Sequence, residues 1–238
     1  MNRKKIFDFI AEKNPKYDLK SYIGSNPRLI QFMNEPTEEH KKHLLRNHPE
    51  LYYTIENPSV ELQLFAIKNS VYPINDFTRR NAIDDLNVGL QISKWFNLDS
   101  YYVRLAFVRK DPKMIVFIDN PEEGLNLEAV IIKPEIIKYI SNPTEEVQMI
   151  SVQKDGQLIK HIENPTERVQ LYIIEETPEF FYLINNPSNN VKKFYRQKLN
   201  DELEHLKDTQ TRLPSNTVVQ SKIDYISKEL EKIGNLGY

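Results

Sequence analysis

Apolar residues recur along this chain with a period of 22 residues, and a proline marks the same point of each period. With that proline as position zero, position 4 holds His40, Leu62, Leu125, Val147, Val169 and Val191. Positions 8 and 9 are apolar as well, in Leu44-Leu45, Ala66-Ile67, Ala129-Val130 and Ile173-Ile174. Apolar residues at these spacings share one face of an α-helix, so the pattern predicts a helix, called helix A, in each unit.

The start of helix A carries its own signals. Asn precedes the proline at Asn57-Pro58, Asn120-Pro121, Asn142-Pro143, Asn164-Pro165 and Asn186-Pro187. Asn is a strong N-cap residue, and proline suits the first helical turn. Glu123, Glu145 and Glu167 follow three residues after an Asn, as a capping box requires. We therefore expect Asn to cap helix A, and we expect the first-turn acids to serve the cap and the helix dipole rather than catalysis.

A second helix, called helix B, is predicted in the other half of each unit. Position 13 holds Pro49, Pro112, Pro134 and Pro178, with Gly156 in the same place. Proline there ends helix A and can open a new helix. The apolar positions that follow are 15, 16 and 19, for example Ile136, Ile137 and Ile140, or Leu158, Ile159 and Ile162. The pattern predicts a short helix B with Ile140 and Ile162 in its core.

A fixed short period indicates stacked units rather than a globular core around one cleft. We predict a single all-α domain over 1–238, a right-handed α-solenoid of about nine two-helix repeats. The expected parts are an N-terminal capping helix at 1–13, repeats at 14–208, a polar linker at 209–215 and a C-terminal capping helix at 216–234. The register of the repeat is lost at 70–100. We expect this segment to be either a degenerate unit, which starts at Asn81-Ala82 and includes Leu86, or a functional elbow.

Position 5 of the unit is polar although it adjoins the apolar face. It holds Gln63, Gln148 and Gln170, with Asn126 in the fourth case. We expect a ladder of side-chain amides that hydrogen-bond between units.

The composition narrows the chemistry. The chain has no cysteine, which excludes disulfides, thiolate zinc sites and cysteine catalysis, and its net charge is −2. Phosphate-binding loops and nucleophile elbows are missing from the sequence. No signal peptide or membrane span is recognised in the sequence, so we expect a cytoplasmic location. Because no catalytic motif is found either, we expect a protein that is not an enzyme, with no catalytic residues, cofactor or metal. His40 and His43 are spaced to share a metal, but they also fit a less apolar repeat.

The segment Ile140-Ser-Asn-Pro-Thr-Glu-Glu-Val-Gln148 resembles the short paired-helix repeats of the HEAT-like and leucine-rich-repeat-variant kind. It is most similar to an uncharacterised repeat of bacterial and phage proteins. The similarity is strong over 110–195 and moderate over 14–70. It implies a right-handed α-solenoid with a binding role and brings no catalytic residues with it. The occurrence of such repeats in phages implies a host-interaction or counter-defence role.

The binding surface is expected where the units differ from one another. Position 17 varies, and it holds Gln31, Tyr53, Val116, Lys138, Lys160 and Tyr182. Aromatic and basic residues dominate interface energetics, so these residues are the predicted contacts with a partner protein, and Trp95 in the irregular segment is the next candidate. A variable solvated face is the alternative reading.

The alternative function is a protein that binds or mimics nucleic acid. Lys138, Lys154 and Lys160 recur in successive units, with Arg104 and Arg109 earlier in the chain. Interleaved acids and a pI near 6.3 argue against a phosphate-binding stripe.

Overall fold

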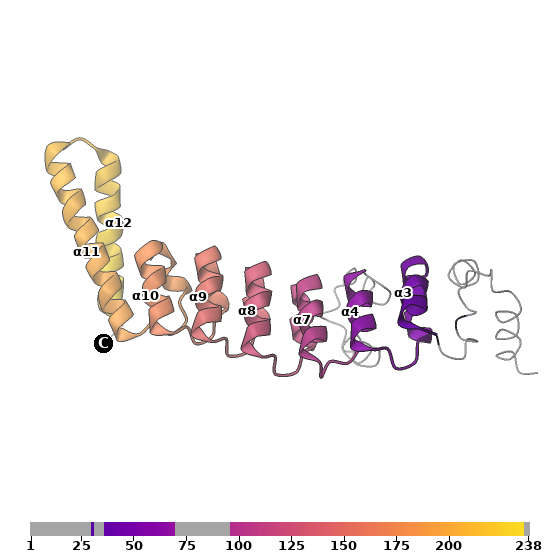
Figure 1. The fold of residues 1–238 in the computed structure, drawn as a ribbon. Coiled ribbons are helices and arrows are strands. Elements are labelled where there is room, and N and C mark those ends of the chain that lie inside the picture. Colours follow the sequence, from indigo (N-terminus) through magenta and orange to yellow (C-terminus); the bar gives the residue numbers. More distant parts are fainter. Residues whose placement is uncertain (1–29, 31–35, 70–95, 236–238) are drawn as a thin grey trace, which may run out of the picture. The chain divides into compact units, whose positions relative to one another are not determined.

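A computed structural model describes residue 30 and residues 36–69 and 96–235 of the chain, and every element in these ranges is a helix (Figure 1). The chain is an all-α helical repeat. Its contacts divide it into two compact units, residues 1–129 and 130–238, and each is described by itself. The predictions of one continuous domain and of a right-handed superhelix stay predictions. The predicted N-terminal capping helix, Gln31 and Trp95 lie outside the described residues.

Ten-residue or shorter α-helices alternate with six-residue 3-10 helices in both units. The first unit contains α3 (Glu38–Asn47), η2 (Pro49–Thr54), α4 (Val60–Lys68), α7 (Tyr101–Lys110), η4 (Pro112–Phe117) and most of α8 (Glu123–Ile132). The second unit follows with η5 (Pro134–Tyr139), α9 (Glu145–Lys154), η6 (Gly156–His161), α10 (Glu167–Glu176), η7 (Pro178–Leu183), α11 (Asn189–Arg212) and α12 (Thr217–Asn235).

The predicted helix B is the 3-10 helix of each repeat. Its hydrogen bonds run between residues three apart, such as Ile136 N to Lys133 O at 3.0 Å. The predicted core residues are buried, including Ile136 and Ile137, each 1% exposed. Ile140 and Ile162 are buried too, but each lies one residue after its 3-10 helix in extended backbone. Their predicted burial is confirmed, and their predicted position within the helix is wrong.

In α4, α9, α10 and α11 the N-cap is not the predicted Asn but the Ser or Thr that follows the proline. The hydroxyl of Ser59 accepts from Leu62 N at 3.1 Å, and Ser188 caps Val191 N in the same way at 3.2 Å. The Asn has another role, because Asn142 has a left-handed backbone with φ of 51°. A residue before proline avoids the α region, and Asn tolerates the left-handed one, so Asn turns the chain into the cap. Asn57, Asn120 and Asn186 share this conformation.

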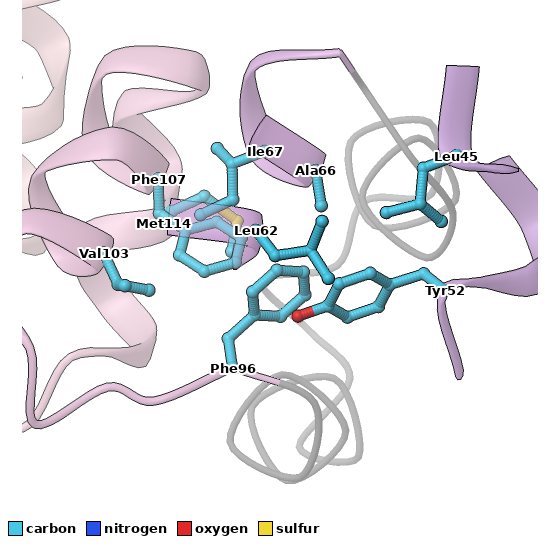
Figure 2. Packing of buried hydrophobic residues seen from close by; sticks show 9 residues of the cluster. All are labelled: Leu45, Tyr52, Leu62, Ala66, Ile67, Phe96, Val103, Phe107 and Met114. Atoms are coloured by element: carbon cyan, nitrogen blue, oxygen red, sulfur yellow. The ribbon is translucent and has the colours of Figure 1, made fainter. Parts of the chain in front are cut away.

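The core of the first unit joins α4 directly to α7. Its buried residues are Leu45, Tyr52, Leu62, Ala66, Ile67, Phe96, Val103, Phe107 and Met114 (Figure 2). Phe96 stacks on Tyr52 with ring centroids 4.9 Å apart and meets Phe107 edge-on at 4.8 Å. The degenerate unit predicted at 81–86 lies outside the described residues. Among the described residues, α4 and α7 pack directly against each other.

The end of the second unit departs from the repeat. Position 13 of the last unit is Asn200 rather than proline, and α11 therefore continues to Arg212 instead of ending after about ten residues. It pairs with the predicted C-terminal helix, observed as α12, in a long hairpin (Figure 1). Val219, Ile226 and Ile233 of α12 are buried. The linker predicted at 209–215 is thus mostly helix, and the turn begins at Leu213.

Candidate binding groove between two repeats

A groove of about 550 Å³ lies in the second unit between the connections that follow η5 and η6. One wall is formed by residues 138–143, and the other by His161, Glu163 and Asn164 of the next repeat. The buried Ile140 and Ile162 anchor the two connections, so the polar residues beside them are held at the surface.

Gln148 connects the two walls, because its Nε2 donates to Asn164 O on the second wall at 3.4 Å. Its Nε2 also donates to Pro143 O at 2.9 Å, and its Oε1 accepts from Thr166 N of the next repeat at 2.9 Å. Gln148 is 3% exposed, so these hydrogen bonds are protected from water. The predicted amide ladder is therefore present as bridges from side chain to main chain, and the distance between the walls is fixed.

The same bridge occurs elsewhere. Gln170 bonds Pro165 O at 2.7 Å and Ser188 N at 3.0 Å, and Gln63 bonds Pro58 O at 2.9 Å and Asn97 N at 2.7 Å. Asn126 is one methylene shorter. Its Nδ2 lies 3.5 Å from Pro121 O, and its buried Oδ1 has no partner among the described residues.

The walls of the groove carry polar groups that serve no internal contact. Among the described residues, the side chains of Ser141, His161 and Glu163 form no hydrogen bond or ion pair, and all three are exposed. The Lys138 ammonium lies 4.7 Å from the centre of the Tyr139 ring. The groove thus offers a hydroxyl, an imidazole, a carboxylate and an ammonium to a ligand.

The structure brings only part of the predicted contact row to this groove. Lys138 lines it, while the exposed Lys160 occupies the same position of the next repeat outside the lining. Val116 is half-buried in η4. Tyr182 is 54% exposed, but its hydroxyl donates to Glu229 of α12 at 2.7 Å. Tyr53 lies in η2, and its side chain is outside what the structure describes.

Glu229 is the unexpected member of this contact, because it is a carboxylate only 3% exposed. Lys232 and Tyr182 both donate a hydrogen bond to Glu229, and both lower its pKa, Lys232 more than Tyr182. Burial acts in the opposite direction, but the pKa of Glu229 stays below its ordinary value. Burial and the Glu229 carboxylate together raise the pKa of Tyr182. Tyr182 therefore fastens η7 to α12.

The first-turn acids act between repeats. The hydroxyl of Thr166 and then the Arg168 guanidinium lower the pKa of Glu145, and Ser188 and then Asn190 lower that of Glu167. Ser188 Oγ lies 2.7 Å from Glu167 Oε2. Each carboxylate thus binds the N-cap residue of the next helix A, a role that its place at the helix start did not reveal.

His40 is a capping residue in the structure. Its Nδ1 accepts from Thr37 N at 3.4 Å, and its own N donates to the Thr37 hydroxyl at 3.3 Å, which completes a capping box. Within the described ranges, no group of three or more His, Asp or Glu side chains is arranged to hold a metal ion. None of the helices in those ranges is long and apolar enough to cross a membrane.

Comparison with protein-family models, with curated proteins and with solved structures finds no significant match for this chain. The groove residues His161, Glu163 and Asn164 were not singled out as contacts by the sequence. The signal that could have found them is their place beside the buried Ile162, at the same point of the repeat as residues 139–142 beside Ile140.

Proposed function

We propose that this protein is a non-enzymatic helical-repeat scaffold that binds a partner protein, and that an extended segment of the partner lies in the groove between residues 138–143 and 161–164. The observation that carries the proposal is the set of polar groups in this groove, Ser141, His161 and Glu163, that have no hydrogen-bond or ion-pair partner among the described residues. Exposed side chains that neither pack nor bond within the fold are available for recognition.

The chemistry of the groove favours a polypeptide. A peptide backbone presents both N–H donors and C=O acceptors, and the groove offers both kinds of partner. Lys138 and His161 donate, Glu163 accepts, and Ser141 does both. The fixed spacing set by Gln148 limits the reorganisation that binding would require.

The same chemistry disfavours the nucleic-acid alternative. Glu163 places a carboxylate in the groove, where it would repel a phosphate. In the first unit, Arg104 pairs with Glu122, and Arg109 pairs with Glu128 at 2.8 Å. These two arginines of the predicted basic row are therefore already neutralised by carboxylates.

Site-specific photo-crosslinking tests the proposal. A photoreactive phenylalanine analogue replaces His161 in the groove, and a matched variant carries it at the exposed Gln153 of α9. Both are expressed in bacterial cells with and without phage infection, because the resemblance of the repeats implies a host-interaction role. We expect a protease-sensitive adduct at 161 that is absent at 153.

The groove assignment is then checked with purified components. The partner found in the adduct should lose about tenfold or more in affinity when Lys138 and His161 are changed to alanine. Lys154→Ala, an exposed lysine outside the groove, is the control and should bind as the unchanged protein does. A nuclease-sensitive adduct would support the nucleic-acid alternative, and equal adducts at 153 and 161 would contradict the groove.

A further inference from the structure

A second cavity lies in the last part of the second unit, where η7 meets the α11–α12 hairpin. Its volume is about 320 Å³. It is lined by Pro178 and Glu179 from η7, by Tyr195, Leu199 and Glu202 from α11, and by Lys222, Tyr225 and Ile226 from α12. One water molecule has about 30 Å³ of liquid volume, so the cavity has room for a side chain.

Tyr195 is the feature of this cavity that the fold leaves unexplained. It is 3% exposed, and its ring is fixed by stacking on Phe181 with centroids 4.2 Å apart. Its hydroxyl nevertheless forms no hydrogen bond with any described residue, although it belongs to the cavity lining. This hydroxyl is not fully enclosed by the described residues, so it is open to the cavity and available to a ligand.

The charged groups around Tyr195 are also unpaired. Glu179, Glu202 and Lys222 take part in no ion pair among the described residues. Two carboxylates against one ammonium leave the lining with an excess of negative charge. Burial raises the pKa of Tyr195 to about 12, and the nearby Glu229, Tyr225, Glu179 and Glu202 add to the rise in that order.

We propose that this cavity binds an arginine side chain of a partner protein. The guanidinium would donate to the Tyr195 hydroxyl and to the carboxylates of Glu179 and Glu202, and the ring of Tyr225 would lie against its face. Guanidinium carries five N–H donors in a plane, which suits several acceptors at once and an aromatic face. Tyr225 is 61% exposed and is available for such a cation–π contact.

The proposal goes beyond the groove between residues 138–143 and 161–164, since it uses different elements and can be tested without a partner protein. Lys222 allows an experiment to distinguish a cationic ligand from an anionic one. For a cationic ligand the Lys222 ammonium is a repulsive neighbour, whereas for an anionic ligand it would be the main attraction. Its removal therefore has opposite effects in the two cases.

The experiment titrates the purified full chain with three blocked tripeptides that have glycine on both sides of a central arginine, citrulline or glutamate. Citrulline has the shape of arginine without its charge. Binding is followed by the NMR signals of the tyrosine rings. We expect saturable binding of the arginine peptide and about tenfold weaker binding of the citrulline peptide, because charge-assisted hydrogen bonds are lost.

Four variants assign the contacts. Glu179→Gln with Glu202→Gln should weaken arginine binding about tenfold, and Tyr195→Phe should weaken it severalfold without unfolding the hairpin. Lys222→Ala should strengthen it by about threefold. Glu204→Gln, an exposed acid of α11 outside the lining, should change nothing. Equal binding of arginine and citrulline, preference for glutamate with loss of binding in Lys222→Ala, or no saturable binding of any peptide would each overturn the proposal.

Discussion

Each of the two units contains a pair of packed A helices, α4 with α7 and α9 with α10, and we call the connection between the helices of a pair a step. Both steps contain the same kind of glutamine hydrogen bond, but it spans very different lengths of chain. In the second unit, Gln148 accepts from Thr166, 18 residues away. In the first unit, Gln63 accepts from Asn97, 34 residues away. The helices that contain these glutamines both pack on a neighbouring helix A, α9 on α10 and α4 on α7. The repeat is therefore defined by contacts in space, and the chain between two contacts can vary in length.

The residues at the two steps explain how register is restored. Phe96 lies four residues before the N-cap Ser100, the same distance at which Ile162 precedes the N-cap Thr166. The ring of Phe96 packs against the rings of Tyr52 and Phe107. Gln63 also bonds a residue three before the N-cap, while Gln148 bonds the N-cap itself. The longer step thus keeps a buried apolar residue at the same distance before the N-cap, but its glutamine bonds a different position.

The largest effect is expected in the core of the regular repeats. Ile162 is 1% exposed, so Ile162→Asp places a charge in a packed stack and should lower the free energy of unfolding by about 4 kcal/mol. Urea denaturation followed by circular dichroism measures the change. Lys160→Asp, at an exposed position of the same repeat, is the control and should alter stability little. Equal midpoints for the two variants would contradict the assignment of Ile162 to the core.

A somewhat smaller loss is expected at the longer step. Phe96→Ala removes a ring that is 2% exposed and should cost about 3 kcal/mol, because the cavity it leaves between Tyr52 and Phe107 cannot close fully. Phe96→Leu should cost less than half as much. Denaturation of the purified variants gives both values. If alanine and leucine behave alike and close to the unchanged protein, Phe96 does not restore the register.

The glutamine bridges allow a direct comparison of the two steps. Gln148→Ala removes three hydrogen bonds and Gln63→Ala removes two, and both leave part-buried main-chain groups unpaired, so each should cost about 2 kcal/mol. Gln153→Ala, at an exposed site in α9, serves as the matched control. A full loss at Gln148 with none at Gln63 would show that the longer step is closed by other contacts.

The smallest effect is a difference in acid sensitivity. Glu145 and Glu167 have lowered pKa values in the folded protein because the next N-cap donates to them, whereas Val60 holds the same position in α4. A lowered pKa means that the stabilisation is complete above the ordinary value of 4.5 and is lost as pH falls through the folded-state value.

Stability should therefore decline below pH 4.5, and Glu145→Gln with Glu167→Gln should make that decline shallower. Denaturation between pH 3 and pH 7 measures the slope. Glu146→Gln is the control, because Glu146 is the adjacent exposed acid in the first turn of α9. If stability declines as steeply with falling pH in the double variant as in the unchanged protein, Glu145 and Glu167 do not cause the acid sensitivity.

The sequence by itself determined the repeat, the first helix of each unit and most of the core. The period of 22 and the apolar positions 4, 8, 9, 15, 16 and 19 are local patterns, and a helix with one apolar face must bury it against a neighbour. The glutamines at position 5 were likewise visible, because a polar residue beside a core stripe needs a hydrogen-bonding partner.

Only the tertiary structure decided the features that depend on what a residue meets in space. The N-cap is Thr144 rather than the predicted Asn142, because Asn142 forms the left-handed turn before proline. At Gly156, which takes the place of proline, a Cβ would lie 3.1 Å from the ring of Phe180 in the next repeat. The direct packing of α4 on α7, the burial of Glu229 beneath Tyr182 and the cavity at Tyr195 join residues far apart in the chain, and local periodicity does not encode such contacts.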